Sequence, residues 1–201
     1  MDRKKRPLNR LTNVRDSKLY VIATEGSKTE KVYLDALSKH YRNSKIHIKI
    51  LERLDPHNSS PNHVIEELNK FKKEYKLDSH DELWMLIDLD RWHRLFDIAQ
   101  KCVQKNFNLA VSNPCFEIWL LLHISDLTNY NKNDLEKSKG YCEKELRNLL
   151  GSYNKSNPDL NHFLPNIKDA INRAKQLDVN LQDRWPISFG SRVYKLVEKI
   201  I

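Results

Sequence analysis

Two carboxylates follow a short apolar run near the middle of the chain. Residues 83–87 form this run, and Asp88 and Asp90 stand one residue apart at its end. Because side chains alternate between the two faces of a strand, both aspartates should project the same way where the strand leaves the core. Like charges so placed repel each other and lose hydration, and a bound divalent cation relieves both penalties. The pair therefore predicts a metal site.

A third carboxylate, Glu25, comes after a strand pattern at residues 19–24 and before Gly26. In parallel sheets, ligands gather outside the carboxyl ends of the strands. If the strands that end at Glu25 and Asp88 are neighbours, Glu25, Asp88 and Asp90 share one pocket. Such a pocket suits Mg²⁺ or Mn²⁺, with waters and substrate phosphate oxygens completing the coordination.

The segments that must position these residues alternate between strand and helix patterns. Strands are predicted at 19–24, 46–51, 82–90 and 107–111. The first predicted helix begins with a Ser27–Glu30 capping box, the second has Pro61 in its first position, and the third spans 95–105. This alternation is typical of an α/β fold with a mainly parallel sheet flanked by helices.

A fourth helix is predicted from Asn113 and Pro114, with Asn113 as its N-cap, leading into the apolar segment 116–122. Because this segment is apolar nearly all round, the helix should be buried. Its Glu117 then needs a basic partner or the metal site, although a favourable charge in the first turn is an equally good interpretation. We expect His123 to be a hydrogen-bonded core residue.

Three motifs carry a resemblance to a known family. T-E-G-S-K-T-E at 24–30, I-D-L-D at 87–90 and S-N-P-C-F-E-I-W-L-L-L-H at 112–123 resemble the RloB (AbiLii-like) family. The Glu-Gly and Asp-Leu-Asp elements also resemble the Toprim domain shared by topoisomerases, primases and OLD-type nucleases. The resemblance implies a Toprim-like fold.

By the same resemblance, Glu25 matches the residue that acts as general acid or base or as a metal ligand, and Asp88 and Asp90 match the metal-binding pair. Family members are typically encoded beside an ATPase and are implicated in bacterial anti-phage or abortive-infection defence. An ATPase subunit is therefore an implied partner. Purely structural roles stay open: Glu25 could hold a helix N-terminus, and the aspartates could form a turn.

Other residues near these motifs are candidates for supporting roles. Glu30, Glu117 and His93 could lie behind the metal ligands, although Glu30 is also the expected capping partner of Ser27. The formal net charge of +8 favours a polyanionic partner such as DNA or RNA. The candidate phosphate contacts are Arg3, Lys4, Lys5, Arg6, Lys28, Arg91 and Arg94.

Three regions follow from composition and pattern. We expect a basic N-terminal arm at 1–17, a Toprim-like domain at 18–124 and a C-terminal helical extension at 125–201 that packs on the core. The three cysteines match no metal or redox spacing and should be buried thiols. No apolar stretch approaches a bilayer span, so we expect a cytoplasmic protein with no membrane partner. A homo-oligomer stays open.

Together these features predict a metal-dependent nuclease, the effector of a defence system with an ATPase partner. Two alternatives remain. The chain could be a non-catalytic nucleic-acid-binding or sensor subunit, or a metal-dependent phosphatase or nucleotidyl transferase. No Walker A string occurs, so hydrolysis of ATP by a P-loop is not expected of this chain.

Overall fold

The computed structural model describes residues 17–26, 28–41, 43, 45–52, 60–89, 95–128, 130, 134 and 139–201. Its strands are β1 (Lys18–Thr24), β2 (Ile46–Ile50), β3 (Glu82–Asp88), β4 (Asn108–Asn113) and β5 (Gly190–Ser191). Its helices are α1 (Thr29–His40), α2 (Pro61–Glu74), α3 (Leu95–Lys105), α4 (Glu117–Ile124), α6 (Lys139–Leu150), α7 (Ile167–Leu177) and α8 (Tyr194–Ile200). Short 3₁₀ turns at Leu160–His162 and Leu164–Asn166 precede α7.

The strands form one sheet in the order β2-β1-β3-β4-β5. β2, β1, β3 and β4 are parallel, and β5 pairs antiparallel with the end of β4. The predicted α/β class with a mainly parallel sheet is confirmed. β5 was not predicted, because two residues are too few to show an alternating pattern.

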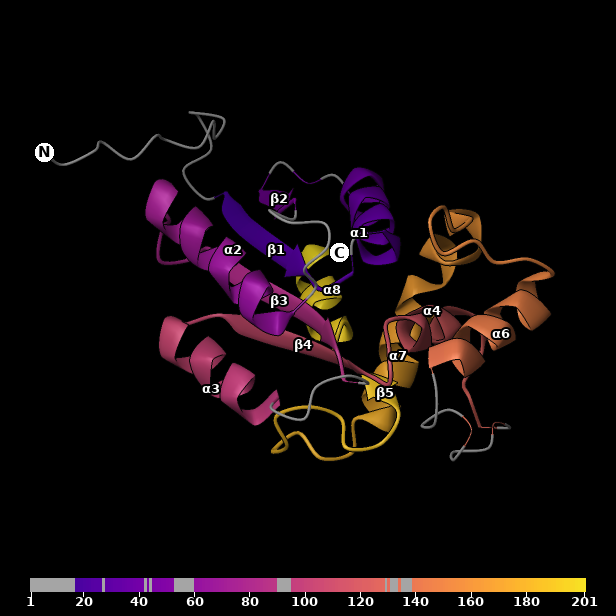
Figure 1. Cartoon of the computed structure of the whole chain (residues 1–201). Helices are drawn as coiled ribbons and strands as arrows, with labels where there is room; N and C mark the ends of the chain where they lie inside the picture. The colour runs from indigo at the N-terminus through magenta and orange to yellow at the C-terminus, as the bar shows by residue number, and fades with distance from the viewer. Residues whose placement is uncertain are drawn as a thin grey trace, which may run out of the picture.

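Helices cover both faces of this sheet (Figure 1). Along β1, Leu19 and Val21 pack with α2 and α3, whereas Tyr20 and Ile22 pack with α1, α4, α6, α7 and α8. This division follows from the two-residue period of a strand. Because both faces of the central strands β1 and β3 are buried, these two strands are apolar at most positions.

The order in which strands are added to the sheet changes direction between β1 and β3, although the strands themselves are parallel. The β1–α1–β2 connection runs toward one edge of the sheet, and the β3–α3–β4 connection runs toward the other. Right-handed crossovers that travel in opposite directions place their helices on opposite faces, as α1 and α3 are observed. The carboxyl ends of β1 and β3 therefore flank the point where open α/β sheets bind ligands.

The Ser27–Glu30 capping box of the first helix stays a prediction. The N-cap of α1 is Lys28, whose side chain makes no capping hydrogen bond, while Ser27 itself lies outside the described residues. The predicted start of the second helix is confirmed: Pro61 is the first residue of α2, and Ser60, its N-cap, accepts a hydrogen bond from the His63 amide.

The predicted start of the fourth helix is wrong. Asn113 is the last residue of β4 and pairs with Gly190, and α4 begins only at Glu117, with Phe116 as an N-cap that makes no side-chain capping bond. The Asn113 side-chain amide instead donates to the carbonyls of residues 186–188 at 3.0 to 3.1 Å. Pairing with a distant segment outweighed the local capping preference.

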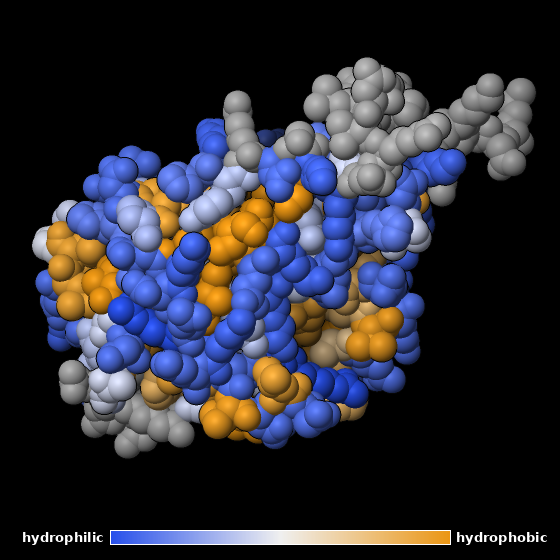
Figure 2. All heavy atoms as spheres, turned by 180° about the vertical axis from the view of Figure 1, so that it is seen from behind, coloured by the Kyte–Doolittle hydropathy of each residue, from blue (hydrophilic) through white to orange (hydrophobic). Residues whose placement is uncertain are grey.

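α4 itself is buried on all sides, as predicted, and Cys102, Cys115 and Cys142 are buried free thiols. Among the described residues, no helix has both the length and the apolar character needed to cross a bilayer. Figure 2 shows a largely hydrophilic rear face on which hydrophobic side chains appear in bands between hydrophilic ones.

Candidate carboxylate site

Glu25 and Asp88 meet at the carboxyl ends of neighbouring strands. Thr24 pairs with Leu86, and the Glu25 amide continues the ladder by donating to the Leu86 carbonyl at 2.9 Å. The Glu25 side chain then reaches across to β3, where its Oε2 accepts a hydrogen bond from the Asp88 amide at 3.2 Å. The relative exposures of Glu25 and Asp88 are 7% and 5%. The expectation that these two acidic residues share one edge of the sheet is met.

Asp88 also contacts the segment that leads into α4. Its Oδ1 accepts a hydrogen bond from the Phe116 amide at 2.9 Å. This amide belongs to the N-terminal end of α4, where backbone donors lack partners within the helix and a carboxylate is favoured. Asp88 therefore ties the ends of β3 and β4 together around the site, a structural role beyond the turn considered from the sequence.

Glu30 folds back over Gly26. A Cβ built on Gly26 would lie 1.8 Å from Glu30 Oε1 and 1.9 Å from Oε2, so the carboxylate occupies the space that a side chain at position 26 would need. Glu30 is itself buried. Gly26 is thus required for close approach of a carboxylate of the same chain, next to Glu25.

Glu117 is the most buried acidic residue of the region, with 1% relative exposure. Its Oε1 forms an ion pair with the Lys155 ammonium at 2.9 Å, and no described residue donates a hydrogen bond to either carboxylate oxygen. Lys155 also donates to Glu143 Oε1 at 3.0 Å, and its carbonyl accepts from Thr29 Oγ1 at 2.7 Å. The basic partner expected for Glu117 is therefore a lysine of the 151–158 segment.

Sequence reasoning missed Lys155. The segment around it has the composition of a loop, and 38 residues separate Lys155 from Glu117, so no local pattern connects them. The available signal was the buried charge of Glu117 itself, which demands a partner without saying where in the chain it lies.

Electrostatic effects connect these acidic residues. A side-chain hydrogen bond with Cys142 and burial raise the pKa of the Cys115 thiol, and the negative charges of Glu117 and Asp88 raise it further. Burial raises the pKa of the Tyr153 phenol, and Glu117 again adds to the shift. Glu117 is thus electrostatically close both to a neighbour of Asp88 and to the 151–158 segment.

The donor chemistry of this region suits a hard divalent cation, because carboxylate oxygens are the ligands that Mg²⁺ and Mn²⁺ prefer. The buried Oε2 of Glu117, which has no hydrogen-bond partner in the described part of the chain, is an acceptor that such a cation would satisfy. However, no three His, Cys, Asp or Glu side chains of the described ranges gather closely enough to hold an ion. Asp90, the predicted further ligand, lies outside those ranges. Glu25, Asp88 and Glu117 therefore offer carboxylate oxygens of the preferred kind, but they do not form a complete set of cation ligands among the described residues.

Comparison with known proteins gives one match. The model of a family described as RloB-like protein matches residues 20–200, which is most of the chain. The chain belongs to the RloB-like family. The matched range includes Glu25, Asp88, Glu117 and Lys155. No curated protein and no solved structure was found to match it.

Several predicted site residues of this RloB-like chain lie outside the described ranges. These are Arg3, Lys4, Lys5, Arg6, Asp90, Arg91, His93 and Arg94. Lys28 is described and exposed at the N-terminus of α1. His123 is a hydrogen-bonded core residue, as predicted, with Nδ1 2.8 Å from the Trp119 carbonyl oxygen and Nε2 3.1 Å from the Tyr33 hydroxyl oxygen.

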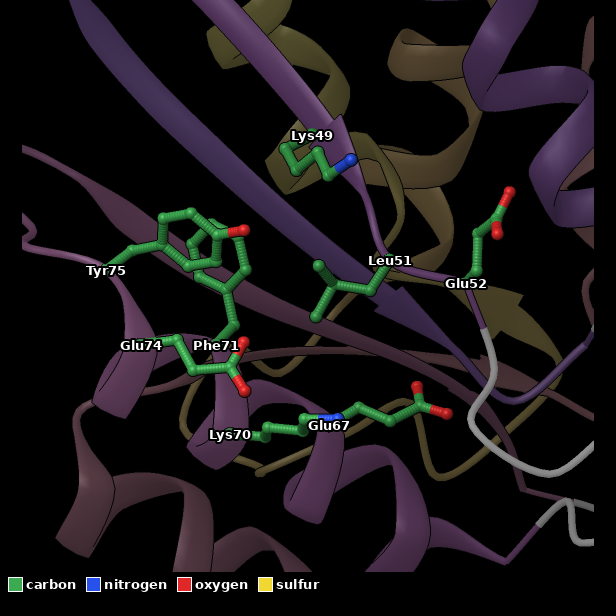
Figure 3. Close-up of a pocket in the computed structure, with 8 residues that line it drawn as sticks. All are labelled: Lys49, Leu51, Glu52, Glu67, Lys70, Phe71, Glu74 and Tyr75. Atoms are coloured by element: carbon green, nitrogen blue, oxygen red, sulfur yellow. The ribbon is translucent and has the colours of Figure 1, made fainter. Parts of the chain in front are cut away.

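This RloB-like structure also has a small cavity of about 180 Å³ between the end of β2 and α2 (Figure 3). The stacked rings of Phe71 and Tyr75, with centroids 4.4 Å apart, form an apolar side. The lining residues are Lys49, Leu51, Glu52, Glu67, Lys70, Phe71, Glu74 and Tyr75. Neither Glu25 nor Asp88 lines it, so this cavity is distinct from the carboxylate site.

Proposed function

We propose that the chain is a metal-dependent nuclease that hydrolyses phosphodiester bonds at the sheet edge formed by Glu25 and Asp88. One observation carries this proposal: Glu25 Oε2 accepts a hydrogen bond from the Asp88 amide at 3.2 Å, across the carboxyl ends of β1 and β3. This edge lies at the reversal of strand order, where open α/β sheets bind ligands. Mg²⁺ or Mn²⁺ is the proposed cofactor, since hard cations prefer carboxylate oxygens.

In the proposed mechanism, Glu25, Asp88 and Asp90 would hold the cation, which would supply polarisation of the scissile phosphodiester when bound. The Asp88 amide orients the Glu25 carboxylate, and the Phe116 amide orients that of Asp88. Because Glu25 and Asp88 are buried, their charges interact more strongly than they would on the surface. Glu25 is the proposed proton acceptor or donor for the hydrolytic step.

DNA or RNA is the proposed substrate, and an ATPase subunit is the proposed partner. The net charge of +8 supports a polyanionic substrate. Membership of the RloB-like family supports a place as the effector of an anti-phage or abortive-infection system. Since the sequence has no Walker A string, P-loop hydrolysis of ATP is assigned to the partner.

The test is cleavage of long DNA and long RNA by purified full-length protein, with Mg²⁺ or Mn²⁺ and with a chelator. We expect cation-dependent cleavage that falls about a hundredfold or more in Glu25→Gln and in Asp88→Asn. These amide substitutions keep an acceptor for the Asp88 and Phe116 amides, so the fold should persist. Parallel assays with mononucleotides separate a nuclease from a phosphatase or nucleotidyl transferase.

Glu66→Gln is the matched control, because it removes one negative charge from the exposed surface of α2. It should cleave like the wild type. Cleavage that survives Glu25→Gln and Asp88→Asn at the wild-type rate would exclude this site as the seat of the reaction.

The non-catalytic sensor subunit remains the second candidate, favoured by one observation. Glu25 and Asp88 each use a carboxylate oxygen to hold a backbone amide, which a purely structural pair would also do. A sensor predicts nucleic-acid binding by gel shift with no cleavage at any cation concentration.

A further inference from the structure

Lys155 lies between a buried and a partly exposed carboxylate. Its ammonium is 2.9 Å from Glu117 Oε1 and 3.0 Å from Glu143 Oε1. The relative side-chain exposures are 1% for Glu117, 21% for Glu143 and 39% for Lys155. The ammonium therefore stands between the deepest acidic side chain of the candidate site and the solvent.

This arrangement is poorly explained by stability alone. Replacing a buried ion pair by well-packed apolar residues is often neutral or stabilising, and every residue of α4 between Ile118 and Leu122 is apolar and buried. A structural carboxylate would also have its oxygens hydrogen-bonded, yet the buried Oε2 of Glu117 has no such partner among the described residues. A buried carboxylate oxygen without a hydrogen-bond donor indicates that Glu117 binds a cation as its ligand.

We propose that Lys155 is a displaceable counter-ion: its ammonium neutralises Glu117 in the cation-free protein and shifts to Glu143 when a divalent cation binds at Glu117. This inference rests on the cation site of the proposed nuclease and adds Glu117 to its ligands. The ammonium and the divalent cation compete for one carboxylate, because two positive charges so close together repel each other.

The surroundings of Lys155 permit this exchange. Its backbone carbonyl is held by Thr29 Oγ1 at 2.7 Å, on the first residue of α1, so the segment can stay in place while the side chain moves. A lysine ammonium sits on a flexible four-carbon stem with rotatable donors and readily changes partners. Glu143 already accepts a hydrogen bond from it, so the displaced charge keeps a carboxylate partner.

The test is binding of Mn²⁺ alone to the full-length protein, measured by electron paramagnetic resonance of the free ion. Lys155→Met removes the competing charge and should tighten Mn²⁺ binding about tenfold. Glu143→Gln removes the negative charge toward which Lys155 moves and should weaken binding several-fold. Glu117→Gln removes the proposed ligand and should weaken it about tenfold or more. Lys175→Met, which removes a lysine paired with Glu198, is the control for net charge and should leave affinity unchanged.

Opposite shifts in Lys155→Met and Glu143→Gln support the proposal, since a merely structural ion pair predicts no change in cation affinity. Unchanged or weaker binding in Lys155→Met overturns it, as does unchanged binding in Glu117→Gln. Should Lys155→Met fail to fold, Glu143→Gln decides, because this side chain is partly exposed. Absence of saturable Mn²⁺ binding in every variant also overturns it.

The cleavage assay separates this inference from the nuclease proposal. If the variants show the predicted changes in Mn²⁺ affinity but the protein cuts no nucleic acid, the nuclease proposal is refuted and the counter-ion proposal stands. Protein that cuts nucleic acid but whose Mn²⁺ affinity ignores residues 117, 143 and 155 refutes the counter-ion and retains the nuclease.

Discussion

The acidic residues at the ends of β1 and β3 combine a structural role with the proposed chemical one. Glu25 and Asp88 accept hydrogen bonds from backbone amides, so truncation to alanine removes both a charge and a bond that orients the chain. An effect of alanine on activity would therefore be ambiguous. Amide substitutions are the better probes because they change the charge while keeping an acceptor.

Gly26 offers a test at the same scale. Gly26→Ala places a methyl group where the Glu30 carboxylate lies, 1.8 Å from its Oε1. Because a carboxylate is the movable end of a flexible side chain, we expect it to swing away at a cost of about 1 kcal/mol in the free energy of unfolding. We expect the loss in cleavage rate, expressed as a free energy, to exceed the loss in the free energy of unfolding, because the displaced charge lies beside Glu25. Urea unfolding and the cleavage assay measure the two effects.

A double-mutant cycle with Glu30→Ala isolates the cause. Once the carboxylate is absent, adding Gly26→Ala should change stability little further. Fully additive losses would mean that Gly26 is needed for some other reason than space for Glu30.

At the scale of elements, α4 contacts both α1 and α7 on one face of the sheet. Its His123 contacts the Tyr33 hydroxyl on α1, with ring centroids 5.6 Å apart, and also packs against Phe163. Arg173 of α7 donates to the carbonyl of Leu122 at 2.8 Å. Polar contacts as well as apolar packing therefore hold α4 in place. They keep Glu117, in the first turn of this helix, in a defined position.

His123 makes stability depend on pH. Burial lowers its pKa from the ordinary 6.5 to about 4. Between these values the unfolded chain binds a proton that the native state does not, so stability is fully present above pH 6.5 and falls as the pH drops toward 4. The shift corresponds to roughly 3 kcal/mol in the free energy of unfolding. Denaturant unfolding at pH 7, 6, 5 and 4 measures this loss.

His123→Gln should be less stable than the wild type at pH 7 but lose less of its stability between pH 7 and 5. His63→Gln, at a partly exposed position, serves as the control and should retain the wild-type pH dependence. Parallel curves for the wild type and His123→Gln would contradict the assignment.

At the scale of the whole molecule, the two parts of the sequence share one core. The larger hydrophobic cluster joins residues of β1, β3, α1 and α4 to residues of α6, α7 and α8. Polar contacts repeat this pattern: Glu82 at the start of β3 pairs with Lys18 and with Lys199 of α8. Buried Arg192 pairs with Asp178 and anchors the segment that leads into β5. The range 125–201 therefore completes the core that supports the carboxylate site.

A truncation tests this. A fragment of residues 18–124 would expose the apolar surface of α4 and of one sheet face, so we expect no cooperative unfolding transition and weak protection of its amides from hydrogen exchange. Residues 18–201 are the control and should unfold cooperatively. A fragment 18–124 with a sharp urea transition would show instead that the first range is an independent domain.

The sequence by itself determined the local elements. Two-residue and 3.6-residue apolar periods predicted four strands and the main helices, because each pattern encodes which side of an element is buried. The abrupt change from apolar run to carboxylate located Glu25 and Asp88 at strand ends. Features that depend only on residues close together in the chain could therefore be predicted from the sequence.

Only the tertiary structure decided how these ends meet. That β1 and β3 are neighbours, that Asn113 holds residues 186–188 and that Lys155 faces Glu117 all depend on contacts between segments far apart in the chain. Such contacts leave no periodic trace, because a buried carboxylate or amide states its need for a partner without stating which residue supplies it. The physical reason is that burial and hydrogen bonding are satisfied in space, whereas a sequence pattern records only what lies within a few residues.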